Sequence, residues 1–166
     1  MNKTIIVILL VTFVLSQAQV GQLYKKIIHN VDPDVKCLDG SSPAIYFHQG
    51  TDTNNFLIYF IGGGYCMGTS LSEVLESCYK RSKTDLGSSK YLPETFEGHG
   101  ILSTDPAMSK FATWTKIYIN YCDGAYYTGA TKQPYRYKDA ELYFHGLYIV
   151  RSHLKWLVNN FGLASA

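Results

Sequence analysis

The stretch Phe56-Leu57-Ile58-Tyr59-Phe60-Ile61-Gly62-Gly63-Gly64-Tyr65-Cys66 decides how this sequence folds. It opens with a run of apolar residues, and β-branched and aromatic side chains of this kind favour a strand. Glycines follow at once, and residues without a β-carbon let backbone N–H groups approach a ligand oxygen closely. Such N–H groups can stabilise the negative oxygen that develops in acyl transfer. The stretch therefore predicts a strand that ends either in an oxyanion-binding loop or in a tight glycine turn against the sheet.

The N-terminal residues have the pattern of a targeting sequence. Lys3 precedes an apolar run from Ile5 to Leu15, and Ser16-Gln17-Ala18 offers a small-x-small cleavage site. An uncleaved membrane anchor is the alternative, but the apolar run is only about half of the ~20 residues that a spanning helix needs. We therefore predict a secretory signal peptide over residues 1–18, a lead-in over 19–36, and a secreted or secretory-pathway protein.

The remaining residues have the size and apolar content of a single domain, placed at 37–166, with no internal repeat. Of the 15 basic residues, removal of Lys3 leaves 14 against 13 acidic ones. A nearly neutral chain creates no strong field for nucleic acid or anionic lipid. We expect no nucleic-acid partner, and no membrane association once the signal peptide is cleaved.

Four cysteines are present, Cys37, Cys66, Cys78 and Cys122. Thiols pair in an oxidising compartment, so two disulfides are expected, and three pairings are possible. Zinc is the competing use, but the spacing of Cys66 and Cys78 is too wide for a zinc knuckle and no histidine pair lies close by. A Cys66–Cys78 bond would close a small loop behind the glycines. A Cys37–Cys122 bond would tie the start of the domain to the end of a later strand.

Hydrophobic patterns predict the other elements. Ala44–His48 and Phe56–Ile61 are two strands around a polar turn, which indicates a hairpin. Trp114–Tyr121 is rich in β-branched and aromatic residues and indicates a central strand. A short helical turn is expected at 71–76, a long irregular loop at 81–110, and an amphipathic helix from Gly146 that ends at Gly162. Strands and helices in this order predict an α/β fold with a mainly parallel sheet.

Several ordered motifs resemble the pectin acetylesterase family, which includes the Notum carboxylesterases. The segment Cys37-Leu38-Asp39-Gly40-Ser41-Ser42-Pro43-Ala44 is similar to the Cys-x-Asp-Gly-Ser-x-Pro motif near the start of the family's domain. Gly62-Gly63-Gly64-Tyr65-Cys66 is similar to its Gly-Gly-Gly-Trp-Cys loop, with tyrosine in place of tryptophan. Three further motifs follow in the family's order: Leu86-Gly87-Ser88-Ser89-Lys90-Tyr91, Gly100-Ile101-Leu102-Ser103 and Tyr121-Cys122-Asp123-Gly124.

This resemblance implies the N-terminal part of an α/β-hydrolase fold. Members use a Ser-Asp-His triad to deacylate acylated polysaccharide or acylated protein, and the serine lies in a Gly-x-Ser-x-Gly elbow. No such elbow occurs in this sequence, and the family's triad positions lie beyond the resembling region. We therefore expect a fragment of a secreted carboxylic ester hydrolase that contains no catalytic residue and is inactive by itself.

The resemblance also implies roles for residues that are present. Gly63 and Gly64 occupy the positions of the family's oxyanion-hole donors, and Tyr65 is a candidate for the acyl pocket. The family's disulfide pairing joins Cys66 with Cys78 and Cys37 with Cys122, which leaves no thiol for catalysis. Neither a metal ion nor another cofactor is expected.

None of the histidines has a serine or carboxylate partner that is visible in the sequence, and we interpret all of them as surface or core residues: His29, His48, His99, His145 and His153. His145 departs from the family, which usually has Phe-Arg-Gly where this chain has Phe144-His145-Gly146. A different class of function also fits, a secreted non-catalytic paralogue that binds glycan or protein. The 14 tyrosines, six of them between Tyr118 and Tyr137, could provide a sugar-stacking surface for it, or an exposed sheet edge could pair with a full-length enzyme.

Overall fold

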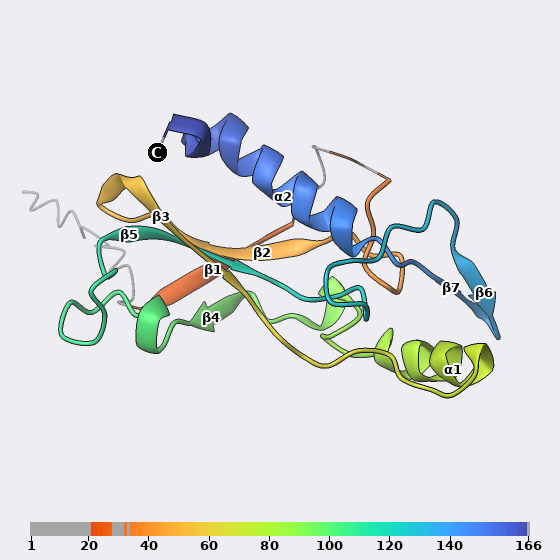
Figure 1. Cartoon of the computed structure of the whole chain (residues 1–166). Coiled ribbons are helices and arrows are strands. Elements are labelled where there is room, and N and C mark those ends of the chain that lie inside the picture. Colours follow the sequence, from red (N-terminus) through yellow and green to blue (C-terminus); the bar gives the residue numbers. More distant parts are fainter. Residues whose placement is uncertain (1–20, 28–31, 33, 166) are drawn as a thin grey trace, which may run out of the picture.

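The computed structural model describes residues 21–27, 32 and 34–165; the predicted signal peptide lies outside them. A sheet with strand order β3-β5-β2-β1-β4 forms the centre (Figure 1). Its strands are β1 (Gln22–Ile27), β2 (Ala44–His48), β3 (Asp52–Phe60), β4 (Thr95–Glu97) and β5 (Trp114–Ile119). β3 and β5 pair in parallel, and the other described pairs are antiparallel. The fold is α/β, as predicted, but this part of the sheet is mixed rather than mainly parallel.

The predicted hairpin between Ala44–His48 and Phe56–Ile61 is wrong, because β5 lies between β2 and β3. Five successive residues of β5 are buried, from Thr115 to Ile119. A strand that is covered on both faces belongs in the interior of a sheet, with a partner on each side. β3 is largely exposed or half-buried and therefore occupies the edge of the described sheet. The polar turn reverses the chain but does not make its two strands neighbours.

Helix α2 (Gly146–Phe161) covers one face of the sheet (Figure 1). Its Leu157 joins a core cluster with Ile45, Ile117 and Ile119. The helix ends where the sequence predicts, since Gly162 has a φ of 69° and so forms the left-handed cap. The last predicted helix is thus confirmed, and its apolar spacing faces the strands.

The opposite face is covered by the segment that the sequence analysis left as an irregular loop. This segment contains the short β4 and two 3-10 turns, Ser89–Tyr91 and Gly100–Leu102. Leu92 and Leu102 pack there against Leu23, Tyr46 and Tyr118. β1 and β4, neither of which was predicted, pair with each other at this side of the sheet.

Beyond the end of the sheet lie helix α1 (Leu71–Arg81) and a hairpin of β6 (Tyr135–Tyr137) and β7 (Ala140–Leu142) (Figure 1). The predicted helical turn is therefore a full helix, and the hairpin was not predicted. Ser70 caps α1 by accepting a hydrogen bond from the Glu73 N–H. Leu75 of α1 packs against Leu38 and Leu142. No helix in the described part of the chain is long and apolar enough to cross a membrane.

Candidate functional site

The glycine loop follows β3 directly and lies at the surface. Gly62 and Gly64 are exposed, and Gly63 is half-buried. Among the described residues, none accepts a hydrogen bond from the N–H groups of Gly62, Gly63 and Gly64. Backbone donors that are solvated rather than paired remain available to a ligand oxygen.

Both ends of this loop are fixed. At its start, the Ile61 carbonyl accepts a hydrogen bond from the Tyr127 hydroxyl at 2.8 Å. At its end, the Cys66 N–H donates to the Gly124 carbonyl at 2.9 Å. Cys66 is also bonded to Cys78 of α1. The turn after β5 and helix α1 therefore hold the loop from two sides.

Arg81, the last residue of α1, fixes the orientation of the central peptide. Its Nη1 donates to the Gly63 carbonyl at 3.0 Å. The Gly63 carbonyl and the Gly64 N–H belong to one planar trans peptide and point in opposite directions. Because the guanidinium holds the carbonyl, the Gly64 N–H is directed away from α1. Gly64 has a φ of 70°, a conformation that favours glycine.

Two motifs from the sequence analysis meet behind this loop. Asp39 accepts hydrogen bonds from Ser41 and Ser88, and its Oδ2 lies 2.9 Å from Lys90 Nζ. Burial raises the pKa of Asp39, but the hydrogen bonds from Ser41, Lys90 and Ser88 outweigh it and hold the pKa below its usual value. This polar network joins the segments 37–44 and 86–91.

The joined segments also determine the space at Gly63. A β-carbon on Gly63 would lie 2.7 Å from Leu86 Cδ2 and 3.1 Å from Tyr121 Cδ1. A β-carbon on Gly62 would meet nothing within 4 Å. A β-carbon at position 63 would have to displace the end of the Leu86 side chain, and position 64 favours glycine because of its backbone conformation, whereas position 62 tolerates a side chain.

The turn after β5 is organised by Asp123, which is fully buried. Its Oδ1 accepts hydrogen bonds from the N–H groups of Ala125 and Tyr127, and its Oδ2 accepts one from Gly129. Burial raises the pKa of Asp123, and these hydrogen bonds oppose the increase. The carboxylate thus holds in place the turn that carries Tyr127 to the start of the glycine loop.

Tyr65 does not point into the core. Its ring is 46% exposed and lies 5.1 Å, centroid to centroid, from the ring of Tyr126, which is 53% exposed. Tyr126 and Tyr127 have φ values of 53° and 61°, which are rare for aromatic residues. Sequence reasoning missed Arg81. It included Tyr126 and Tyr127 among the tyrosines between Tyr118 and Tyr137 that could stack on a sugar, but it did not place them beside the glycine loop.

The disulfides are Cys37–Cys122 and Cys66–Cys78, the pairing that the family resemblance implies. No cysteine in the described part of the chain is free. In the chain-entropy model, closing loops of 85 and 12 residues stabilises the fold by about 4.5 and about 3 kcal/mol respectively. The first bond holds β5 to the start of the domain, and the second holds the glycine loop to α1.

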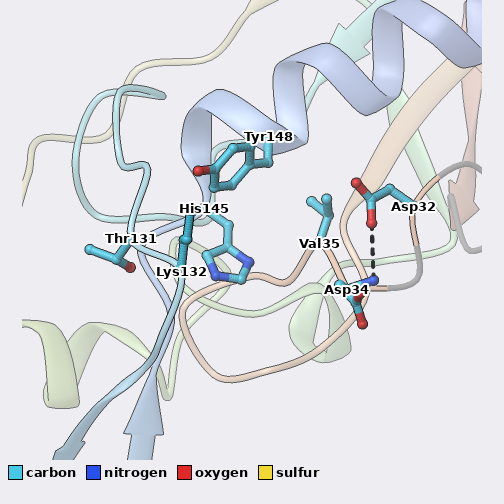
Figure 2. A pocket seen from close by; sticks show the side chains of 7 residues that line it. All are labelled: Asp32, Asp34, Val35, Thr131, Lys132, His145 and Tyr148. Carbon is cyan, nitrogen blue, oxygen red and sulfur yellow. Dashed lines mark hydrogen bonds between the residues drawn. The ribbon is translucent and has the colours of Figure 1, made fainter.

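Histidines are not gathered at this site. His145 lines a separate cavity of about 220 Å³ with Asp32, Asp34 and Tyr148 (Figure 2). Its Nδ1 accepts a hydrogen bond from the Lys36 N–H at 3.3 Å, so the proton of the neutral ring lies on Nε2. Burial lowers the pKa of His145. The ring links the start of α2 to the segment that contains Lys36, which is a structural role.

The other described histidines also lie away from the glycine loop. His48 contacts the Gln22 carbonyl, His99 is exposed, and His153 is fully buried in α2. His29 lies outside the described residues. Over the residues that the structure describes, no group of three or more histidine, cysteine, aspartate or glutamate side chains is arranged to hold a metal ion.

Comparison with known proteins identifies the family. The family model described as Pectinacetylesterase matches residues 16–166 of this chain. The chain belongs to the pectin acetylesterase family. Pectin acetylesterase 4 of Arabidopsis thaliana is 37% identical over 113 residues, which are 66% of this chain and 26% of the relative. Human palmitoleoyl-protein carboxylesterase NOTUM is 29% identical over 140 residues, or 82% of this chain and 26% of the relative.

A solved structure shows the same fold. The Wnt deacylase Notum from Drosophila superposes with a TM-score of 0.73 at 23% identity, covering 87% of this chain and 40% of the Notum chain. The described region is therefore part of an α/β-hydrolase-like fold. The chain spans about a quarter of the length of the curated relatives that it matches.

Proposed function

We propose that this chain provides the oxyanion-binding side of a secreted carboxylic ester hydrolase. Gly63 and Gly64 donate their N–H groups to the oxygen of the tetrahedral intermediate, and Tyr65 lines the substrate side of the same site. The observation that carries this proposal is the exposed glycine loop, whose N–H donors have no acceptor among the described residues while Arg81 holds the Gly63 carbonyl at 3.0 Å. Donors that are fixed in advance need no reorganisation during the reaction.

The nucleophile must come from elsewhere, because the sequence contains no Gly-x-Ser-x-Gly elbow. We therefore expect residues 19–166 alone to show no esterase activity. Membership of the pectin acetylesterase family supports a Ser-Asp-His mechanism for the complete enzyme. Activity of the isolated chain that a serine-directed inhibitor abolishes would contradict this assignment.

A chimera tests the oxyanion role directly. The aligned 113-residue region of Arabidopsis pectin acetylesterase 4 is replaced by the corresponding region of this chain, which keeps the host's catalytic residues. We expect the chimera to hydrolyse acetyl esters. Arg81→Met should then lower kcat at least about tenfold with little change in KM, because the Gly64 donor loses its orientation.

Lys83→Met is the matched control, since Lys83 is also a cation near the end of α1 but contacts Tyr79 rather than the loop. If Arg81→Met and Lys83→Met have the same kcat, the loop does not act in catalysis. The substrate is assigned by comparing acetylated pectin with a palmitoleoylated peptide, the two kinds of ester that the relatives' names specify. The faster substrate shows whether polysaccharide or protein is deacylated.

The alternative is a secreted, non-catalytic protein that binds glycan or protein. The observation that favours it is the exposed aromatic pair of Tyr65 and Tyr126. The test measures glycan binding and labelling by a fluorophosphonate probe on the natively secreted protein. Glycan binding without any labelling would support this alternative over the hydrolase.

A further inference from the structure

Asp123 connects the turn after β5 with the start of α2. Its Oδ1 accepts hydrogen bonds from the Ala125 and Tyr127 N–H groups at 3.2 and 3.1 Å, and its Oδ2 accepts one from Gly129 at 3.3 Å. A β-carbon on Gly146, the first residue of α2, would collide with the same Oδ2. The carboxylate therefore binds the turn while it packs against the helix.

The turn that Asp123 binds has a costly backbone conformation. Tyr126 and Tyr127 have φ values of 53° and 61°, and left-handed backbone is unfavourable for residues with a β-carbon. Such conformations persist where the surrounding structure fixes them. The Tyr127 hydroxyl donates to the Ile61 carbonyl at 2.8 Å and lies 3.1 Å from the Ile119 carbonyl. One side chain thus connects the turn held by Asp123 to the start of the glycine loop.

No cationic side chain in the described part of the chain forms an ion pair with Asp123. The titratable groups around it are Tyr121 and Tyr127 on its own turn, Arg81, which reaches this turn from α1, and His145, which precedes α2. The two tyrosines are neutral at physiological pH, and Arg81 donates to the glycine loop instead. The charge of Asp123 is therefore stabilised by backbone N–H groups.

Burial makes this charge sensitive to acid. Asp123 has no exposed surface, and burial raises its pKa above the ordinary 3.8, although its hydrogen bonds oppose the increase. Because the pKa is then higher in the folded chain than in the unfolded chain, protonation of Asp123 itself favours the folded state. The folded protein therefore takes up this proton. Additional polypeptide can only reduce the exposure of a group, so the burial also holds in a longer chain.

Protonation removes acceptor capacity that the turn needs. An ionised carboxylate only accepts hydrogen bonds, whereas a carboxylic acid uses one oxygen as a donor. Hydrogen bonds to an ionised acceptor are also roughly twice as strong as those to a neutral one. The three N–H groups then share a weaker acceptor, and the left-handed conformation of Tyr126 and Tyr127 loses contacts that stabilise it.

We propose that Asp123 and Tyr127 are positioning residues that make the orientation of the glycine loop depend on pH. While Asp123 is ionised, the turn is fixed and the Tyr127 hydroxyl holds the Ile61 carbonyl. When Asp123 is protonated, the turn loosens, this hydrogen bond weakens, and the Gly63 and Gly64 N–H groups lose their fixed orientation. The inference rests on the proposed function and adds its regulation, because acyl transfer then falls on acidification while the protein is still folded.

Nuclear magnetic resonance of the full chain tests this coupling without any need for catalysis. The ¹³C signal of the Asp123 carboxyl and the ¹H–¹⁵N signals of Gly63 and Gly64 are followed from about pH 7.5 to about pH 4. We expect the carboxyl and both amides to titrate at one common pH, which lies above 3.8. Circular dichroism of the same samples identifies the range in which the chain is folded. In Asp123→Asn, the amide signals should no longer follow this titration.

Tyr127→Phe separates the titrating group from the loop. This variant lacks the hydroxyl but keeps the N–H that binds Asp123, so the carboxyl should titrate as before. The pH-dependent shift of the glycine amides should fall at least about threefold, because the hydrogen bond that transmits the change is absent. Tyr46→Phe is the matched control, because the buried Tyr46 hydroxyl also donates to a backbone carbonyl, that of Pro93, on the other side of the sheet.

Two results would overturn the proposal: glycine amides that do not move when Asp123 titrates, or amides that move equally in Tyr127→Phe and the unsubstituted chain. The chimera described above provides the kinetic measurement. On the acidic side, log(kcat/KM) should fall with a slope of about 2, and with a slope of about 1 in Asp123→Asn, because the host's catalytic histidine accounts for one proton. Equal slopes would also contradict the proposal. The hydrolase assignment is judged separately, by hydrolysis of a small aryl acetate at neutral pH.

Discussion

Replacing His153 by leucine should remove much of the acid sensitivity of this fold. His153 is fully buried on the face of α2 that carries Ile149 and Leu157, and neither of its ring nitrogens has a described hydrogen-bond partner. Burial lowers its pKa from 6.5 to about 3. Between these two pH values His153 is protonated in the unfolded chain but neutral in the folded chain. Stability is therefore lost as the pH falls from 6.5 toward about 3.

The size of this effect follows from the pKa difference. Each pKa unit corresponds to about 1.4 kcal/mol, so the histidine accounts for a loss of about 2.5 kcal/mol between about pH 7 and about pH 4.5. Other groups also titrate in this range, among them His145, whose pKa burial lowers from 6.5. They contribute equally to the unsubstituted and variant proteins, and their effects cancel when the two pH-dependent losses are subtracted.

Urea unfolding at both pH values, followed by circular dichroism, measures this difference. His153→Leu should lose about 2.5 kcal/mol less than the unsubstituted protein on acidification. His99→Leu is the matched control, because it makes the same substitution at an exposed position. Equal acid losses for His153→Leu and the unsubstituted protein would refute the reasoning, because the imidazole would then be protonated equally well in the folded state.

Three further predictions concern the glycine loop and are measured by urea unfolding. Gly62→Ala should be nearly neutral, and Gly64→Ala should cost about 1–2 kcal/mol because of its left-handed φ. Gly63→Ala should cost about 1 kcal/mol, at the low end for overpacking, because the end of the Leu86 side chain can shift. Equal costs at all three positions would contradict the packing described. Arg81→Met should destabilise by about 1.5–3 kcal/mol, because a hydrogen bond from a charged donor to the Gly63 carbonyl is lost; a neutral result would mean that solvent replaces the guanidinium. Asp123→Asn should cost about 1–3 kcal/mol, since one amide oxygen cannot serve three N–H donors; unchanged stability would show that the turn forms without the carboxylate.

Local patterns in the sequence predicted the elements that carry their own signals. The α2 spacing and Gly162 indicate a helix and its end, and the structure has both. The apolar run of β5 predicts a buried strand, and five of its residues are buried. These predictions succeed because periodicity and capping depend on residues only a few positions apart.

Strand order depends on contacts that no local pattern contains. A turn at 50–55 suggested a hairpin, yet β5, more than fifty residues later, pairs with both strands. In β1 only Leu23, the second residue, is buried; the rest of the strand is exposed or half-buried, and the segment was interpreted as a lead-in. β4 is only three residues long and gives too short a pattern to detect.

In the candidate site, too, the residues of one consecutive stretch could be predicted from the sequence, and the residues that reach it from other elements could not. Gly63, Gly64 and Tyr65 were predicted as site residues from the resemblance to the family's Gly-Gly-Gly-Trp-Cys loop, and their roles stay predictions. Arg81 was not found and Tyr127 was not placed at the loop, since each reaches the loop from a separate element. Sequence thus indicated which backbone groups could bind an oxyanion, while the residues that orient those groups became evident only from the fold.

The contacts that fix the glycine loop all come from residues between Ile61 and Tyr127. Tyr127 holds its start, Arg81 holds its central peptide, and Gly124 and the Cys66–Cys78 disulfide hold its end. None of these contacts requires a nucleophile or a substrate. The N–H groups of the loop are therefore oriented by folding itself. Under the function proposed above, this orientation needs no reorganisation when charge develops on an ester oxygen. It follows that substitutions at Arg81 should affect the rate of acyl transfer more than the affinity for substrate.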